Sequence, residues 1–272
     1  MTGLSPCGEM VRKSDPVRFR TALFAPPDAR EGLFALYAFN LEIAKIAPMV
    51  SEPMIGEIRL QWWRDSLDMA FGEGAVRRHE VVEPLAAIIR SADLPRAPFD
   101  ALIDARAQDL DPVFPVDIST LTPYLRETAG SLTLLAMRAL GGEMDAAALN
   151  AGQGIGIARY LTAVPVLAAQ GRAPLPGNID WKTLRDGGAD AVFALQVDDL
   201  VTQGRASIAS ARNARRRISK RAAPAFLEVP VADRYLAGIE RGSDSMAVLA
   251  ADQPSPFRAN LSNLWRGITG LW

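Results

Sequence analysis

The chain has 272 residues, of which 49% are hydrophobic and 22% are charged, and its formal net charge at pH 7 is −1. This balance is typical of a soluble globular protein, and a charge so near zero excludes a global field that would recruit nucleic acid or an anionic membrane. One cysteine and one histidine exclude an internal disulfide, a cysteine-based zinc site and a histidine-rich metal site. A single cysteine also favours a reducing compartment.

Neither a membrane span nor a targeting segment is evident. No stretch reaches the roughly 18 to 20 continuous apolar residues of a membrane span, and residues 1–20 lack the apolar run of a signal peptide. We expect a cytoplasmic protein, which is either free in the cytoplasm or bound peripherally to the inner membrane. Residues 1–27 are expected to be loosely ordered up to Phe19. Residues 28–254 are predicted to form one domain, followed by a C-terminal amphipathic helix over 255–272.

Two strongly apolar helical patterns stand near the start of this domain. The first runs from Asp28 to Pro48, which should end or kink it, and the second runs from Pro53 to Gly72. Both are apolar over much of their circumference. We therefore expect both helices to be central and to be contacted from several sides.

Further helices are expected at about 81–90, 98–110, 122–140, 145–164, 181–184, 190–223 and 231–250. Gly152, Gly154 and Gly156 would be costly in a free helix, so neighbouring backbone should pass close to them, and Gly130 similarly suggests a close crossing. Pro165 should break the 145–164 helix. No strand precedes the glycines, which excludes a dinucleotide site. No segment alternates as a strand does, so the predicted fold class is all-α.

Three stretches resemble the squalene/phytoene synthase family: LYAFN at 36–40, QWWRDSLD at 61–68 and GRAPLP at 171–176. The resemblance covers nearly the whole chain in order. It implies an all-α isoprenoid-synthase bundle, whose members join two prenyl diphosphates head to head. In that family two Asp-x-x-x-Asp motifs bind Mg²⁺, because carboxylates four residues apart share one helix face. The Mg²⁺ ions hold the diphosphate and neutralise it as it leaves.

All four aspartates that the resemblance implies are absent from this chain. Aligned on LYAFN, the positions of the first motif hold Ala44 and Pro48. Aligned on GRAPLP, those of the second hold Ala163 and Leu167. The resemblance therefore supports the fold and argues against the reaction. We predict no catalytic residue, no metal ligand and no cofactor.

The substitutions resemble one branch of the family, the mitochondrial complex I assembly factors of this fold and their bacterial relatives. The shared features are FN-x-E at 39–42, SE-x-x-IG at 51–56, the tryptophan-rich second helix and Leu-x-Ala-x-Pro at 161–165. This resemblance implies a non-catalytic protein that assists assembly of respiratory complex I. Its partners would be complex I subunits or another membrane protein under assembly, and nucleic acid is not expected.

Two other functions stay open. One is a Mg²⁺-dependent prenyltransferase with altered ligands, which condenses two prenyl diphosphates head to head. The other is a lipid carrier without an assembly role. Turnover of prenyl diphosphates with Mg²⁺ would support the first, whereas a bound apolar ligand without an effect on complex I would support the second.

A remnant cavity is expected between the helices at 28–47, 53–71 and 145–164, where it would hold a lipid or prenyl ligand. Arginines near it could bind an anionic head group without a metal, because a guanidinium pairs with a carboxylate or phosphate through two hydrogen bonds. The residues predicted to line the cavity are Tyr37, Asn40, Arg59, Arg64, Arg159, Tyr160 and Arg172.

Two segments near the C-terminus bear on partners. Residues 212–221 hold six basic side chains, which are predicted to lie on a helix and to face solvent, anionic lipid or an acidic partner. Leucines and tryptophans between 261 and 272 fall on one helical face. That face would pack on the bundle or dock on a membrane or a partner.

Overall fold

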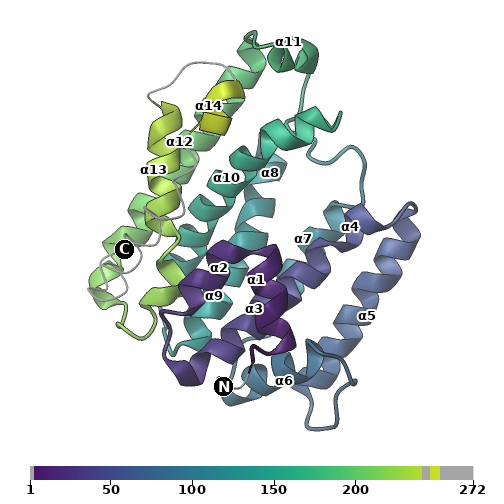
Figure 1. The fold of residues 1–272 in the computed structure, drawn as a ribbon, viewed down its shortest axis with the longest axis vertical. Coiled ribbons are helices and arrows are strands. Elements are labelled where there is room, and N and C mark those ends of the chain that lie inside the picture. The colour runs from purple at the N-terminus through teal and green to yellow at the C-terminus, as the bar shows by residue number, and fades with distance from the viewer. Residues whose placement is uncertain (1–2, 241–245, 252–271) are drawn as a thin grey trace.

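The computed structural model describes residues 3–240, 246–251 and 272, and within them every regular element is helical, which confirms the all-α class (Figure 1). The α-helices are α1 (Pro6–Ser14), α2 (Pro16–Ala22), α3 (Pro27–Ala44), α4 (Ile46–Met49), α5 (Pro53–Phe71), α6 (Val82–Ser91), α7 (Ala97–Gln108), α8 (Ile118–Leu125), α9 (Ser131–Ala139), α10 (Asp145–Ala169), α11 (Trp181–Arg185), α12 (Ala191–Asn213), α13 (Val229–Glu240) and α14 (Met246–Ala251). A π-helical turn, η1 (Arg126–Gly130), joins α8 to α9, and two short 3₁₀ turns, η2 (Arg215–Arg217) and η3 (Ala223–Phe226), follow α12.

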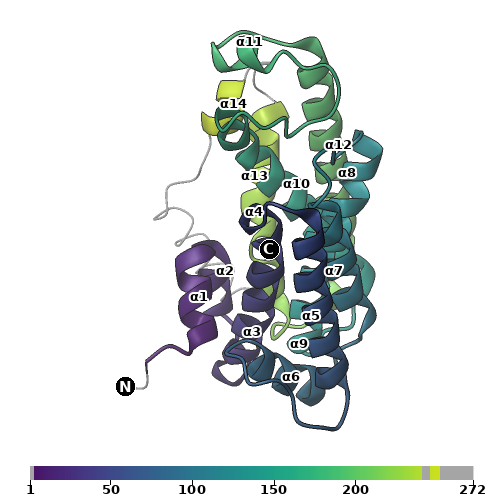
Figure 2. The ribbon, with the colours of Figure 1, turned by 90° about the vertical axis from the view of Figure 1, so that its right-hand side faces the viewer.

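Two long helices organise the bundle. Helix α10 packs against α9, α12 and α13, while α3 packs against α1, α6 and α9 (Figures 1 and 2). Helix α3 is buried on every side, with an unbroken run of buried residues from Leu33 to Asn40. This run confirms the central place predicted for the first apolar pattern.

Helix α5 differs from the expectation of a second central helix. It buries one face, which includes Leu60, Trp63 and Leu67, against its neighbours α6 and α7. On its outer face Met54 is 72% exposed and Ile58 is 64% exposed. The prediction that α5 is contacted from several sides was therefore wrong. The apolar side chains extend round more of the helix than α6 and α7 cover, so those on the outer face remain exposed.

Most of residues 3–27 are helical rather than loosely ordered. Helix α1 is capped by Ser5, whose hydroxyl accepts the Gly8 N–H at 3.0 Å, and α2 is capped by Asp15, whose carboxylate accepts the Arg18 N–H at 3.0 Å. Capping side chains satisfy backbone donors that a helix start leaves free. Both helices pack on α3. The expectation of a loose N-terminus was wrong because the charged stretch is held by tertiary contacts that its composition does not reveal.

The glycines of α10 lie where other helices approach closely, as predicted. A Cβ built on Gly152 would lie 2.4 Å from the Ala129 carbonyl oxygen, and one built on Gly154 would lie 2.5 Å from the Ile208 side chain. The first contact sets α10 against η1, and the second sets it against α12. Pro165 does not break the helix, which continues to Ala169, since tertiary packing on both sides of the proline outweighs the lost backbone hydrogen bond.

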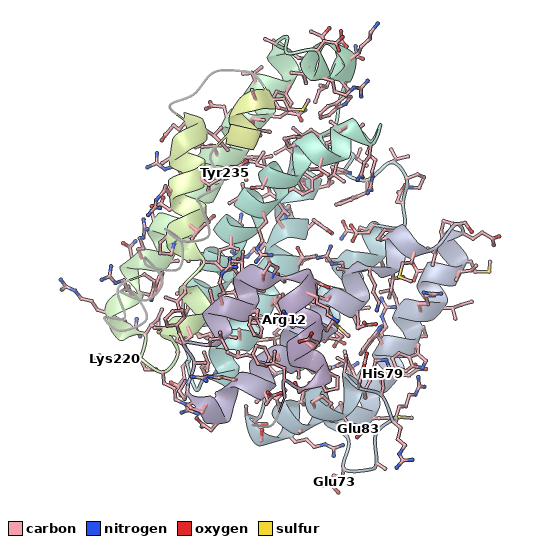
Figure 3. All side chains as sticks on the ribbon, in the orientation of Figure 1. Arg12, Glu73, His79, Glu83, Lys220 and Tyr235 are labelled. Carbon is pink, nitrogen blue, oxygen red and sulfur yellow. The ribbon has the colours of Figure 1, made fainter. Side chains whose placement is uncertain are left out.

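The basic run at residues 212–221 is only partly helical. Helix α12 ends at Asn213, so most of residues 212–221 lie in η2 and the loop after it rather than on the predicted helix, with Lys220 exposed (Figure 3). Two members of the run are ion-paired: Arg212 with Asp233 at 2.7 Å, and Arg221 with Asp28 at 2.6 Å. These two arginines therefore pair with the helices α13 and α3 of the same chain.

The predicted C-terminal amphipathic helix at 255–272 lies outside the described residues except for Trp272. The ring of Trp272 is buried and stacks on Phe226 with ring centroids 4.4 Å apart. Helices α13 and α14 are joined by a hydrogen bond of 2.9 Å, which the Tyr235 hydroxyl donates to the Leu249 carbonyl. In the part of the chain that the structure describes, no helix is both long enough and apolar enough to cross a membrane.

Candidate ligand cavity

A cavity of about 580 Å³ lies between the end of α3, the helix α4 and the start of α5 on one side and the α7–α8 loop and the end of α10 on the other. Its volume lies in the range of small-molecule ligand sites. The α3–α5 segment contributes mainly small or apolar side chains: Ala44, Ala47, Pro48, Val50, Ser51 and Pro53. This part of the wall can contact hydrocarbon.

Three of the four positions at which the family resemblance implies aspartate line this cavity. They are Ala44, Pro48 and Leu167, while Ala163 is not part of the wall. Magnesium is bound in proteins by oxygen ligands, and none of these side chains carries an oxygen atom. Among the described residues no group of three or more His, Cys, Asp or Glu side chains could hold a metal ion. The residues present therefore do not fit the Mg²⁺ site of the family.

The polar part of the wall comes from the end of α7, from α8 and from α10. The guanidinium Nη1 of Arg106 lies 3.1 Å from Asp109 Oδ2 and donates to the Tyr124 hydroxyl at 2.5 Å. The Tyr160 hydroxyl donates to the Pro174 carbonyl, which fixes the loop after α10. Burial raises the pKa of both Tyr124 and Tyr160, so both phenols stay protonated at neutral pH. They can act as hydrogen-bond donors but not as bases.

Two of the seven predicted site residues, Tyr160 and Arg172, line the cavity. Tyr37 and Asn40 are buried along α3, where the Tyr37 ring lies 5.7 Å from the Arg18 guanidinium carbon. Arg59 lies at a separate, smaller pocket of about 260 Å³, beside the tryptophans of α5. Tyr37, Asn40 and Arg59 therefore lie on the predicted helices but outside the cavity that Tyr160 and Arg172 line.

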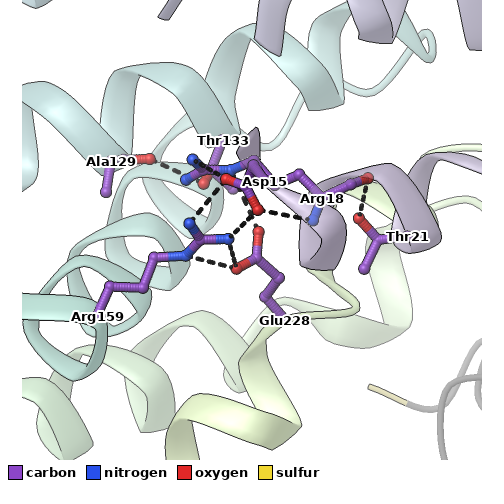
Figure 4. A network of polar contacts seen from close by, with 7 residues as sticks. All are labelled: Asp15, Arg18, Thr21, Ala129, Thr133, Arg159 and Glu228. Carbon is purple, nitrogen blue, oxygen red and sulfur yellow. Dashed lines mark hydrogen bonds and ion pairs between the residues drawn. The ribbon is translucent and has the colours of Figure 1, made fainter. Parts of the chain in front are cut away.

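Arg64 and Arg159 are occupied by ion pairs within the fold. Arg64 pairs with Asp104 of α7 at 2.7 Å. Arg159 donates to both oxygens of Asp15 at 2.8 and 3.1 Å, and to Glu228 Oε2 at 2.6 Å (Figure 4). An arginine engaged in this way joins three segments of the chain and is not presented to the cavity.

The cluster around Arg159 is a largely buried network of two arginines and two carboxylates, in which the Arg159 side chain is 36% exposed. Arg18 completes it, lying 3.1 Å from Asp15 and 3.3 Å from Glu228 (Figure 4). Burial by itself would raise the pKa of Asp15, but Arg159 and Arg18 outweigh it and hold that pKa below its ordinary value. Burial would likewise lower the pKa of Arg159, and the two carboxylates instead raise it. Asp15 and Arg159 are therefore both charged at neutral pH.

Sequence reasoning missed the polar residues that α7, α8 and the loop between them give to the cavity: Arg106, Asp109, Asp111 and Tyr124. None of them lies in a stretch that resembles the family. Arg106 and Asp109 are three residues apart at the end of a helix, a spacing that surface pairs also show. Only the approach of α8 to α7 brings Tyr124 to them.

The sequence relatives of the chain are assembly factors. It is 30% identical over 244 residues to "NADH dehydrogenase (ubiquinone) complex I, assembly factor 6" of Bos taurus, which covers 86% of this chain and 73% of the relative. The homolog of the same factor in Drosophila melanogaster is 27% identical over 258 residues, covering 89% and 76% of the two chains.

Solved structures of synthases share the fold. A dehydrosqualene synthase in complex with ligand superposes with a TM-score of 0.76 at 16% identity, covering 97% of this chain and 95% of that one. The squalene synthase of Alicyclobacillus acidocaldarius gives a TM-score of 0.72 at 19% identity over 86% and 92% of the two chains. These likenesses confirm the predicted isoprenoid-synthase bundle. Residues 11–264 match the sequence model of squalene/phytoene synthases, and the chain belongs to the squalene/phytoene synthase family.

Proposed function

We propose that this protein assists the assembly of respiratory complex I and does so without catalysing a prenyl transfer. The observation that carries the proposal is the sequence relation to complex I assembly factor 6, which extends over 86% of this chain rather than over one motif. Its partners are then complex I subunits or another membrane protein under assembly. We place its action at the inner-membrane surface, to which it would bind peripherally from the cytoplasmic side.

The residues at the cavity support a non-catalytic role. A synthase of this fold needs carboxylates to hold Mg²⁺ and the leaving diphosphate. Here Ala44 and Pro48 stand on one side and Leu167 on another, and the polar side chains of the wall include two arginines, two tyrosines and two aspartates, one of which pairs with Arg106. We propose that the cavity holds a lipid or prenyl ligand instead of turning over a substrate.

The assembly role is tested by deleting the gene in its native host and quantifying assembled complex I by native electrophoresis with an NADH dehydrogenase stain. We expect less assembled complex, restored by a plasmid copy of the wild-type gene. An unchanged level in the deletion strain would contradict the assembly role and leave a lipid carrier as the better reading.

The catalytic alternative is tested with purified protein, labelled farnesyl and geranylgeranyl diphosphates and Mg²⁺, followed by extraction of products. We expect no head-to-head product above the blank without enzyme. A product above that blank would show a prenyltransferase and overturn the non-catalytic reading, whatever the deletion strain does.

A further inference from the structure

The charged side chains of the cavity leave one guanidinium unpaired. Four charged residues line the wall, and two of them, Arg106 and Asp109, neutralise each other. Asp111 accepts the Val113 backbone N–H at 2.9 Å and is exposed to solvent. Arg172 is also exposed and makes no ion pair within the described residues. A compact anion in the cavity would therefore find Arg172 free to bind it.

Arg106 adds positive charge to the wall but does not present its free donor to a ligand. Its Nε atom is buried and has no hydrogen-bond partner in the described part of the chain. Leaving a charged donor buried and unsatisfied is costly. Because that atom is shielded from the cavity, a ligand oxygen could reach it only after the Arg106 side chain shifts. Arg172, on the loop after α10, is the guanidinium that is open to a ligand.

Four exposed apolar side chains, each next in sequence to a residue of the cavity wall, are here called the apolar edge. Met49 is 61% exposed and Met54 is 72% exposed, and they flank the lining residues of α4 and α5. Val113 is 67% exposed in the α7–α8 loop, and Val166 is 59% exposed beside Leu167 of α10. Each of these side chains is adjacent in sequence to a residue of the wall. A hydrocarbon chain that extends out of the cavity would pass along this apolar edge.

We propose that the cavity binds an amphiphile with a compact anionic head, a carboxylate or a phosphate monoester, and that it does so without a divalent cation. The head would meet Arg172, and the chain would lie against the α3–α5 wall and leave over the apolar edge. This inference rests on the proposed role of the cavity as a ligand site, and it does not depend on the assembly role.

The same charges disfavour a diphosphate. Its head carries more negative charge than a carboxylate or a phosphate monoester, one unpaired guanidinium faces it, and the carboxylates of Asp109 and Asp111 stand on the same wall. Synthases of this fold solve that problem with Mg²⁺, which needs chelating carboxylates. Ala44, Pro48 and Leu167 supply none. The cavity of this protein should therefore prefer a compact anion bound without metal, whereas a synthase binds a diphosphate with Mg²⁺.

The test is isothermal titration calorimetry of the full chain at pH 7 in EDTA, with pairs of probes that share a chain and differ in the head. One pair is hexadecanoate and hexadecanol, and the other is farnesyl monophosphate and farnesol; the two pairs separate an acyl from a prenyl source. We expect at least one anion to bind about tenfold more tightly than its alcohol. Farnesyl diphosphate should gain nothing when Mg²⁺ replaces EDTA.

Each contrary result has a distinct meaning. Equal binding of anion and alcohol in both pairs would overturn this inference but leave the cavity as a ligand site. A gain of more than tenfold for farnesyl diphosphate with Mg²⁺ would also overturn it, since that is the behaviour of a metal–diphosphate site. Binding of none of the probes would overturn both the inference and the proposed ligand role.

A pair of variants locates the binding. Arg172→Gln changes an exposed side chain and should lower the affinity for the anion about tenfold while leaving that for the alcohol unchanged. Arg59→Gln is the matched control, an exposed arginine that lies at the separate pocket beside Trp62. It should leave both affinities unchanged. Anion binding that survives Arg172→Gln undiminished would overturn the proposal.

Discussion

Arg159 of α10 donates two hydrogen bonds, of 2.8 and 3.1 Å, to Asp15, a residue 144 positions earlier in the chain. The pairing is bidentate, so it fixes the direction of approach as well as the distance. Because Glu228 accepts from the same guanidinium, the N-terminal helices, α10 and the start of α13 meet at one point (Figure 4). Three segments that are distant in sequence are thus joined by buried charges.

Removing one charge from this network should destabilise the fold strongly. Asp15→Asn keeps the shape of the side chain but leaves Arg18 and Arg159 with Glu228 as their only acid. We expect the free energy of unfolding in urea at pH 7 to fall by about 3 kcal/mol. The control is Asp104→Asn, which breaks an exposed pair with Arg64 and should cost less than about 1 kcal/mol. Similar losses in the two variants would contradict the structural role of the network.

The same carboxylate should make stability depend on pH in a defined window. The pKa of Asp15 is lower in the folded protein than its ordinary value of 3.8. Its contribution is therefore complete above that value and is lost as the pH falls below it towards the folded pKa. The difference in unfolding free energy between wild type and Asp15→Asn should be constant from about pH 5 to 8 and shrink below about pH 4. An equal difference at pH 3 and pH 7 would contradict this assignment.

Gly152 should tolerate no side chain. A Cβ there would lie 2.4 Å from the Ala129 carbonyl oxygen and 2.5 Å from Gly130 Cα, both backbone atoms that cannot move aside without shifting η1. We expect Gly152→Ala to lower the free energy of unfolding by about 3 kcal/mol. Gly74→Ala, with nothing within 4 Å of the added Cβ, should change it by less than about 1 kcal/mol. Urea titrations followed by circular dichroism measure both, and a well-tolerated Gly152→Ala would refute the close crossing.

Cys7 should be inert in the folded protein. Its thiol is buried, and it donates to the Glu80 carbonyl at 3.3 Å. Burial, with a smaller effect of Glu31, raises the pKa of Cys7 to about 12, so almost no thiolate exists at pH 8. A maleimide reagent should label the native chain slowly and the urea-unfolded chain rapidly, as followed by mass spectrometry. Rapid labelling without urea would show that the Cys7 thiol is accessible in the folded protein and would contradict its burial.

Filling the cavity should separate ligand binding from stability. Ala44 lines the cavity, so Ala44→Phe can place its ring in empty space rather than in the packed core. We expect the variant to lose amphiphile binding in calorimetry while its Tm stays within about 4 °C of wild type. Ala87→Phe, on the exposed face of α6, is the control and should keep binding. Full binding by Ala44→Phe would place the ligand elsewhere.

The sequence by itself determined the class of the fold, its family and the course of the central helices. The period of apolar residues, the terminal prolines and the glycines are local signals, and they predicted α3, α5 and the close approach of other helices to Gly152 and Gly154. The four positions without aspartate were identified from the resemblance to the family, by counting along the chain from LYAFN and GRAPLP.

Only the tertiary structure decided what holds the N-terminus and what lines the cavity. Helices α1 and α2 depend on Asp15, whose partner Arg159 is 144 residues away, and no local pattern encodes that pairing. The sequence predicted Arg159 as a cavity residue, whereas its pairing with Asp15 and Glu228 keeps it out of the cavity wall. Arg106 and Tyr124, in turn, meet because α8 packs beside the end of α7. Local sequence sets periodicity and helix ends, but long-range packing chooses which charges become neighbours.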